Sequence, residues 1–259
     1  MKYVSTITAV VAATALVAGC AGSEPSGKDI AAELRAAEAA ASPAPTPLFS
    51  GVRSGEILRR AGREVAQATS FHIVLNTVSS KGPLTVDLSL GRGQRAVGTI
   101  TQDGQTAEIR RIGRNLWVRA GRGFWKKQIV SPSAVSRLAG RWVRMGREND
   151  LTGQFFTLTD LSAVRKDYVV DAETAVSYTS RAPGRTIDGH RTVRLFARAR
   201  DIVDDSEYRI SLYIAGDGPV VPLRYERRSS QKKHTETRVF SGWNEPVTVT
   251  PPPGAVDPD

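Results

Sequence analysis

Side chains that could perform catalysis are few and widely separated in this 259-residue chain. Its three histidines, His72, His190 and His234, all fall on expected strands, and none has a second ligand at the short spacing of a metal site. Ser229-Ser230-Gln231-Lys232 contains the Ser-x-x-Lys string of penicillin-binding serines, but that chemistry needs the serine at the start of a helix. Here the string falls in a polar turn. The sequence therefore predicts no enzyme, no metal site and no cofactor, because a hydrolase would need Ser, His and acid groups to converge.

Clusters of charge point to binding rather than to catalysis. Four acidic residues could take Ca²⁺, but they lack the glycine and the alternate-oxygen spacing of a calcium loop: Asp201, Asp204, Asp205 and Glu207. We expect a solvated turn there. Four pairs of basic residues could meet anionic groups at the mouth of a cavity, or could discourage edge-to-edge pairing of strands: Arg110-Arg111, Lys126-Lys127, Arg227-Arg228 and Lys232-Lys233.

The single cysteine, Cys20, has a sequence context that favours lipidation. Lys2 precedes an uncharged, mostly apolar stretch, Tyr3 to Ala18, that is shorter than the roughly 20 residues of a membrane span. The stretch ends in Leu16-Val17-Ala18-Gly19-Cys20, which resembles the lipobox of bacterial lipoproteins. We expect cleavage before Cys20 and anchoring to the outer face of the cell membrane by two or three acyl chains, such as palmitate. An ordinary secretory signal and an uncleaved anchor helix are the alternatives.

The balance of charge is strongly basic. The formal charge of +10 becomes +9 when residues 1 to 19, with their one lysine, are removed. Outside the cytoplasm such a balance favours anionic headgroups or wall polymers over nucleic acid, for which no recognition motif appears. A solvated basic surface is the simpler alternative. The preference for Arg and Ala over Lys indicates a GC-rich genome.

The sequence divides into four segments. Residues 1 to 19 are the expected signal peptide, and residues 20 to 48 an Ala- and Pro-rich tether that ends in extended backbone. Residues 49 to 253 form the expected folded domain, followed by a frayed tail at 254 to 259. The domain should begin with an amphipathic helix from Ser54 to Thr69, with Ser54 as its N-cap.

Alternating apolar residues predict antiparallel strands through most of the domain. The expected strands start at Phe71 and, after a turn at Lys81-Gly82-Pro83, at Leu84, with a hairpin at Asp103-Gly104. The others are 95–101, 105–112, 115–119, 123–127, 174–181, 190–198, 207–215, 220–229 and 235–243. Helices or turns are expected at 132–140 and 159–164, and an irregular loop at 149–156. About ten strands and two or three helices predict a mainly β fold: one strongly curved antiparallel sheet, a half-barrel, with the helices packed into its concave face around an apolar cavity.

Several motifs in this order are similar to one family. They are Ile112-Gly113-Arg114-Asn115-Leu116-Trp117-Val118, Phe124-Trp125, Ala139-Gly140-Arg141-Trp142-Val143, Gly218-Pro219-Val220-Val221-Pro222-Leu223 and Phe240-Ser241-Gly242-Trp243-Asn244. Over about residues 50 to 253 the chain resembles the LolA/LppX-type lipid-binding lipoproteins of actinobacteria, the group that includes LppX and LprG. The resemblance implies an open half-barrel with a cavity for acyl chains and a role in moving lipids or lipoglycans across the cell envelope. It implies no catalytic residue.

Two inward rows are the best candidates for lining such a cavity: Leu84, Val86, Leu88 and Leu90, and Tyr208, Ile210, Leu212 and Ile214. Trp117 and Trp142 are further candidates, as are Phe124, Trp125 and Trp243, although for each aromatic residue an ordinary place in the sheet core is the favoured alternative. The function expected is a monomeric, membrane-anchored carrier or chaperone for a lipid or lipoglycan. A scaffold or sensor that binds a protein or a wall polymer through its surface is the alternative.

Overall fold

The computed structural model describes residues 47–80, 82–128, 131–146, 150–168, 180–200, 207–229 and 234–257. All of them belong to one unit of the chain, Thr46–Asp259. The expected signal peptide, Cys20 and most of the tether lie outside the described residues. So do Asp201, Asp204, Asp205 and Lys232-Lys233, together with most of the strand expected at 174–181.

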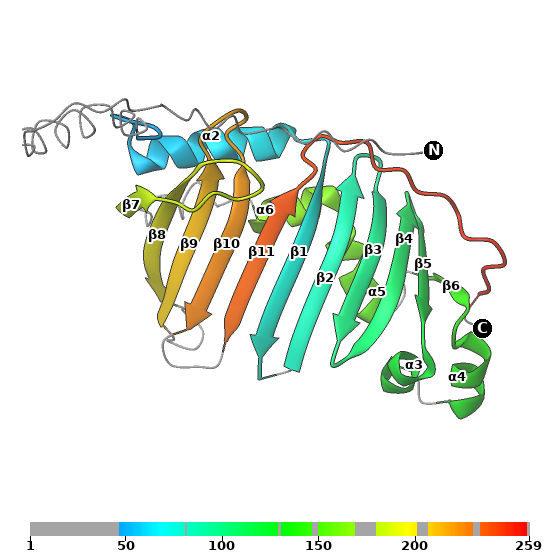
Figure 1. The fold of residues 1–259 in the computed structure, drawn as a ribbon. Helices are drawn as coiled ribbons and strands as arrows, with labels where there is room; N and C mark the ends of the chain where they lie inside the picture. The colour runs from blue at the N-terminus through cyan, green and yellow to red at the C-terminus, as the bar shows by residue number, and fades with distance from the viewer. Residues whose placement is uncertain are drawn as a thin grey trace, which may run out of the picture. The chain divides into compact units, whose positions relative to one another are not determined.

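Eleven strands form one antiparallel sheet that is not closed into a barrel. Its spatial order is β6-β5-β4-β3-β2-β1-β11-β10-β9-β8-β7 (Figure 1), so the first and last long strands of the domain are neighbours at its centre. The strands are β1 Ser70–Ser79, β2 Gly82–Gly91, β3 Arg95–Gln102, β4 Gln105–Ile112, β5 Asn115–Ala120, β6 Trp142–Met145, β7 Ser180–Pro183, β8 Thr192–Arg200, β9 Glu207–Ala215, β10 Pro222–Ser229 and β11 Thr235–Ser241.

The alternation in the sequence explains why these segments form strands with one buried face. In β1, Phe71, Ile73 and Leu75 are buried, as a period of two requires. The predicted hairpin between β3 and β4 is confirmed: Asp103 and Gly104 both have positive φ, at 49° and 74°, which is the backbone of a two-residue type I′ turn. The strongly curved, half-open sheet predicted from the sequence is therefore the fold of this protein.

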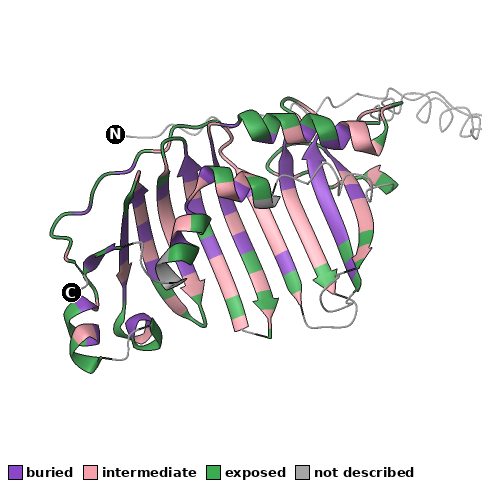
Figure 2. Cartoon of the chain, turned by 180° about the vertical axis from the view of Figure 1, so that it is seen from behind, coloured by how far each residue is buried: buried purple, intermediate pink, exposed green. Residues whose placement is uncertain are grey.

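Five helices accompany the sheet in the described part of the chain: α2 Ser54–Gln67, α3 Arg122–Gln128, α4 Pro132–Leu138, α5 Asp150–Leu158 and α6 Leu161–Tyr168. Figure 1 shows α2 along the upper ends of β8 to β10, and α3 and α4 beside β5 and β6. Seen from behind, α5 and α6 cross one face of the sheet (Figure 2). The helices thus cover the concave face unevenly.

Three local predictions were wrong. The expected strand at 123–127 is helix α3, because Phe124 and Trp125 are both buried, whereas successive strand residues point to opposite faces. The loop expected at 149–156 is largely helix α5. Gly153 weakens helix propensity there, but packing of Phe155 into the core overrides it. Ser54 does not cap α2, whose N-cap is Arg53 without a side-chain bond.

The fold also extends past Pro253, where we expected it to end. Val256 forms a parallel bridge with Val143, donating to the Trp142 carbonyl at 2.9 Å and accepting from the Arg144 amide at 2.8 Å. β6 is an edge strand, and its free backbone groups are satisfied by this segment. The C-terminal segment therefore protects one edge of the sheet.

Candidate functional site

The cross-strand register shows which side chains share the concave face. One row runs through Leu195, Leu212, Tyr225, Arg238, Leu75 and Val86, each directly opposite the next. Both predicted inward rows lie on this face. Val86, Leu88 and Leu90 are buried, as are Tyr208, Ile210, Leu212 and Ile214, and Leu84 is partly exposed. The sequence thus placed these rows on one face, although they come from distant strands.

The first apolar cluster, which we call the large wing, spans β1 to β6 and β11. Leu88, Ile109 and Val118 are fully buried at its centre, and helices α3 to α6 pack against it through residues such as Trp125 and Phe155. Phe124 stacks on Phe155 with ring centroids 6.3 Å apart. The large wing is therefore a conventional core covered by four helices.

The second apolar cluster, the small wing, spans β8 and β9. Its cover is one face of α2, where Ile57, Leu58 and Ala61 lie against strand residues such as Leu195 and Ile214. Arg181 extends to this region and donates to the carbonyls of Phe49 and Val52, which precede α2. No described helix crosses the lower halves of β8 to β11 in Figure 2.

Between the two wings, β10 and β11 place charged side chains on the concave face. This charged band consists of Arg227, Glu236 and Arg238. Glu236 and Arg238 form an ion pair, with 10 % and 17 % of their side chains exposed. Arg227 lies 3.7 Å from the ring centroid of Tyr208, and Arg238 lies 4.7 Å from that of Tyr225. Such cation–π contacts hold the guanidinium groups flat against the aromatic rings.

Tyr225 joins the charged band to the wings, because it packs against both apolar clusters. Burial raises the pKa of its phenol above the ordinary value of 10.0, and this outweighs the opposing effect of the nearby Arg238 guanidinium. Charge is costly in such surroundings. The concave face therefore offers apolar walls on both sides of a narrow cationic strip, a combination suited to an amphiphile.

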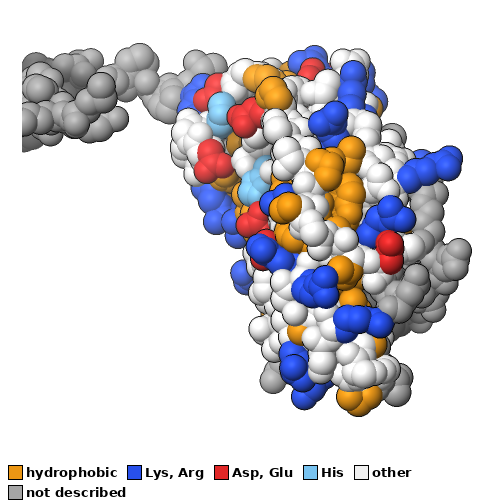
Figure 3. Space-filling view, turned by 90° about the vertical axis from the view of Figure 1, so that its right-hand side faces the viewer, with side chains coloured by type: hydrophobic (Ala, Val, Ile, Leu, Met, Phe, Trp, Pro, Cys, Tyr) orange, Lys and Arg blue, Asp and Glu red, His pale blue; other side chains and the backbone are white. Residues whose placement is uncertain are grey.

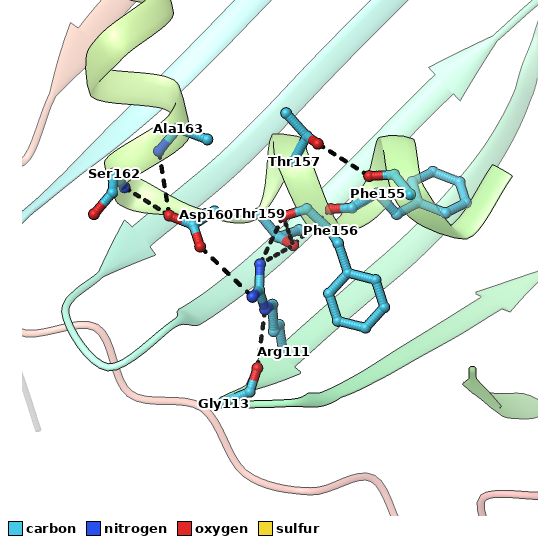
Figure 4. A network of polar contacts seen from close by, with 10 residues as sticks. Arg111, Gly113, Phe155, Phe156, Thr157, Thr159, Asp160, Ser162 and Ala163 are labelled. Carbon is cyan, nitrogen blue, oxygen red and sulfur yellow. Dashed lines mark hydrogen bonds and ion pairs between the residues drawn. The ribbon is translucent and has the colours of Figure 1, made fainter. Parts of the chain in front are cut away.

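Arg111 fixes the helices of the large wing to the sheet (Figure 4). This side chain is 2 % exposed and donates to the Phe156 carbonyl at 2.6 Å and the Thr159 hydroxyl at 3.1 Å. Its Nε donates to the Gly113 carbonyl at 3.0 Å, and Asp160 lies 3.7 Å from its Nη2. The Asp160 carboxylate in turn accepts from the first amides of α6. One buried guanidinium thus holds the junction between α5 and α6.

Two of the predicted cavity residues lie on the opposite, convex face. Trp117 is directly opposite Arg110, and Trp142 directly opposite Arg119. The guanidinium groups of Arg110 and Arg119 lie 4.9 and 5.0 Å from the Trp142 ring centroid. Both tryptophans therefore belong to packing on the outer face, whereas Phe124 and Trp125 lie in the large wing and Trp243 contacts Phe71 and Phe240 at its upper end.

The structure brings together a serine, a histidine and an aspartate that the sequence gave no reason to join. His72 Nδ1 is 3.1 Å from Ser241 Oγ, and its Nε2 is 2.8 Å from Asp87 Oδ1. All three lie on the convex face as cross-strand neighbours, with His72 33 % and Asp87 51 % exposed. Acyl transfer also needs donors aimed at an oxyanion, but strand amides are used by the sheet. The arrangement is a surface hydrogen-bond network.

The other histidines take ordinary surface or packing positions. His190 contacts Asp217 at 3.2 Å, and His234 packs edge-on against the Tyr208 ring. Within the described residues, no three His, Cys, Asp or Glu side chains gather as a metal site would require. None of the described helices is both long enough and apolar enough to span a membrane.

The charged band was not predicted from the sequence, although the pattern of the strands contains a signal for it. Arg227 was recognised only as part of a basic pair, and Glu236 and Arg238 were not singled out. Continuing the alternation of β10 and β11 would have placed these residues on the same face as Tyr225 and Phe240. Inward positions of a strand usually carry apolar residues, so charged residues at these positions indicate a candidate binding site.

Comparison with known proteins supports the architecture. No family model and no well-characterised protein matches the sequence. Among solved structures, LprF from Mycobacterium bovis is similar, with a TM-score of 0.52 and 15% identity over 78% of this chain and 97% of its own. The lipoprotein LppX of Mycobacterium tuberculosis aligns with a TM-score of 0.49 and 18% identity, over 76% of this chain and 98% of its own. The chain therefore has the fold of LprF, as the resemblance to LppX-type lipoproteins predicted.

Proposed function

We propose that this protein is a membrane-anchored envelope lipoprotein that carries a lipid or an acylated glycolipid in the hollow of its sheet. The observation that carries the proposal is the concave face, which is apolar on both wings and covered by helices instead of a second sheet. Each CH₂ group moved from water to such a surface contributes about 0.8 kcal/mol. Transfer of a lipid therefore needs no bond to be made or broken.

The charged band gives the bound lipid an orientation. Acyl chains lie along the small wing and the margin of the large wing where Leu84 is partly exposed, and the polar part of the lipid meets Arg227 and Arg238 between the wings. The two tyrosines beside these arginines, Tyr208 and Tyr225, present both a ring for packing and a hydroxyl for hydrogen bonding. This arrangement favours a ligand with a polar group beside its chains over a wholly apolar one.

The Cys20 anchor completes the proposal by fixing where the protein works. The chain acts as a monomer at the outer face of the cell membrane, within the reach of residues 20 to 48, and without a catalytic step. The solved relative LppX is itself a lipoprotein. Mass spectrometry of the processed chain tests the anchor: an acylated Cys20 at the N-terminus is expected, and Cys20→Ser should release the protein from the membrane.

Lipid extraction tests the carrier role. The purified full chain should release acyl lipids that mass spectrometry identifies, and Leu84→Trp should reduce their amount severalfold, because Leu84 is a partly exposed residue of the concave face. Thr85→Trp is the matched control, since Thr85 lies next to Leu84 but faces the other side. Repeated absence of bound or exchangeable lipid, or equal loss in both variants, would contradict the proposal and favour a surface-binding scaffold.

A further inference from the structure

The convex face carries three arginines side by side on neighbouring strands. Arg198 of β8 is directly opposite Arg209 of β9, which is directly opposite Arg228 of β10. All three residues are exposed. Directly opposed residues of antiparallel strands have Cβ atoms about 5 Å apart, and like charges in such positions destabilise a sheet. We call these three residues the arginine row.

The described carboxylates near the arginine row on this face are engaged elsewhere. Glu226 is engaged by Arg185 at 2.5 Å and by Arg224 at 2.7 Å. Glu207 lies directly opposite another cation, Arg200. Within the described part of the chain, no carboxylate forms an ion pair with a member of the arginine row. The face therefore concentrates positive charge at a cost to the folded state.

A cavity of about 570 Å³ adjoins the arginine row, within the range of about 300 to 1,000 Å³ typical of ligand sites. Its lining combines three arginines with small polar and apolar residues: Arg194, Arg198, Arg209, Ser180, Ser211, Phe196, Ala197 and Ile210. Arg194 donates to the Ser211 hydroxyl at 3.1 Å and lies 5.2 Å from the Phe196 ring centroid. These contacts hold one guanidinium in place at the cavity.

A general excess of basic residues does not distinguish this region. Lys and Arg side chains are also spread over the face that carries β6 and α4 (Figure 3). On α2, Arg59, Arg60 and Arg63 share the carboxylate of Glu56, at 2.6, 3.0 and 3.8 Å. The arginine row differs because its three cations are directly opposed on neighbouring strands and lie next to a cavity. The nearby acid Glu226 of β10 is already engaged by Arg185 and Arg224.

We propose that the arginine row and its cavity bind the phosphate headgroups of an anionic phospholipid membrane. One guanidinium group can donate two parallel hydrogen bonds to a phosphate. The three arginines of the row span about 10 Å, which is enough to contact more than one headgroup at once. The cavity takes one headgroup, with Arg194, Arg198 and Arg209 around it. The arginine row lies on the convex face, opposite the small wing, and it orients the lipid carrier against the membrane that it serves.

Vesicle co-sedimentation tests the proposal, using the full chain with Cys20→Ser so that no acyl anchor contributes. The probes are vesicles of equal parts phosphatidylglycerol and phosphatidylcholine, with pure phosphatidylcholine vesicles as background. The variant R198Q/R209Q/R228Q should lose about a hundredfold in binding to the anionic vesicles, since each of the three arginines contributes about 1 kcal/mol near an anionic surface. Binding of the protein with its arginine row intact to the anionic vesicles should fall steeply at high salt.

The matched control R59Q/R60Q/R63Q removes the same charge from α2 and should change binding less than about twofold. Equal losses in the two variants would show that only net charge matters and would overturn the proposal. So would full binding by the arginine-row variant, or competition by millimolar inorganic phosphate, which would mean a site for a soluble anion. Lipid bound in the hollow should remain in the arginine-row variant, so failure here is distinguishable from failure of the carrier role.

Discussion

The large wing and the small wing share one sheet but differ in how they are closed. Four helices and the buried Arg111 network complete the large wing, and its central residues have no exposed surface. The small wing has only one face of α2 above it. Leu195 and Ile214 are fully buried there, whereas Tyr208 and Ile210, earlier in β9, retain slight exposure. Both wings end at the charged band.

This difference separates stability from binding within a single fold. A core that is fully enclosed loses packing energy whenever a side chain is shortened, so the large wing is suited to holding the sheet in shape. A wing with a partial cover can admit and release an apolar guest without unfolding the sheet. We therefore expect the large wing to supply most of the stability and the small wing to exchange the lipid that we propose as ligand.

The strongest test of this assignment is Arg111→Met. The change leaves the Phe156 and Gly113 carbonyls without their buried donor and removes the cation beside Asp160, so the free energy of unfolding should fall by about 3 to 5 kcal/mol. Urea denaturation measures it, and hydrogen exchange should increase in α5 and α6. Arg110→Met, the adjacent residue on the convex face, should cost less than about 1 kcal/mol. A similar cost for both would refute the role of the Arg111 network.

Truncation of one isoleucine in each wing sharpens the contrast. Ile109→Ala should lower the free energy of unfolding by about 3 to 4 kcal/mol, because its site is fully enclosed, and Ile210→Ala by about 2 kcal/mol. Bound lipid should decrease only in the Ile210 variant. Loss of lipid in the Ile109 variant alone, measured by extraction and mass spectrometry, would reverse the assignment of the wings.

Tyr225 lies at the junction of the wings, and its buried phenol leads us to expect a loss of stability at alkaline pH. Because burial raises the pKa of the folded-state phenol above 10.0, the unfolded chain releases its proton first as the pH rises. Stability is then fully present below about pH 10 and declines as the pH rises toward the folded-state pKa. Urea denaturation between pH 8 and about pH 11 should show a smaller decline for Tyr225→Phe. An identical decline would place the cause elsewhere.

The smallest effect is expected from His72→Ala on the convex face, outside both wings. Its bonds to Ser241 and Asp87 are exposed, so unfolding free energy should change by less than about 1 kcal/mol. Lipid content should remain as in the unchanged protein. A large loss of bound lipid, or loss of an esterase activity with a chromogenic ester, would give the Ser241–His72–Asp87 network a functional role that the wings do not explain.

Most strands were predictable because they repeat apolar residues with a period of two over many positions, as in 84–90 and 207–215. The short edge strand β6 was not predicted, because its four residues are too few to show a period and Trp142 and Val143 are both buried. Helices α3 and α5 were not predicted either, because they are short and their sequences fit other structures equally well. Phe124-Trp125 suits a strand until both rings must be buried on one side. In α5, Gly153 lowers helix propensity. The helix is stabilised by the packing of Phe155 and by the hydrogen bond from Arg111 to the Phe156 carbonyl near its end.

The sequence by itself determined the antiparallel strands, the hairpin at Asp103-Gly104 and the two apolar rows of the concave face, since these follow from local periodicity. Only the tertiary structure decided which face each strand turns toward the helices, because a period of two defines two faces without choosing between them. The structure places Trp117 and Trp142 on the convex face, and Arg227, Glu236 and Arg238 on the concave face. The pairing of β1 with β11 places His72 beside Ser241, 169 residues later in the chain. Local periodicity cannot predict this contact, because it depends on the pairing of strands far apart in the sequence.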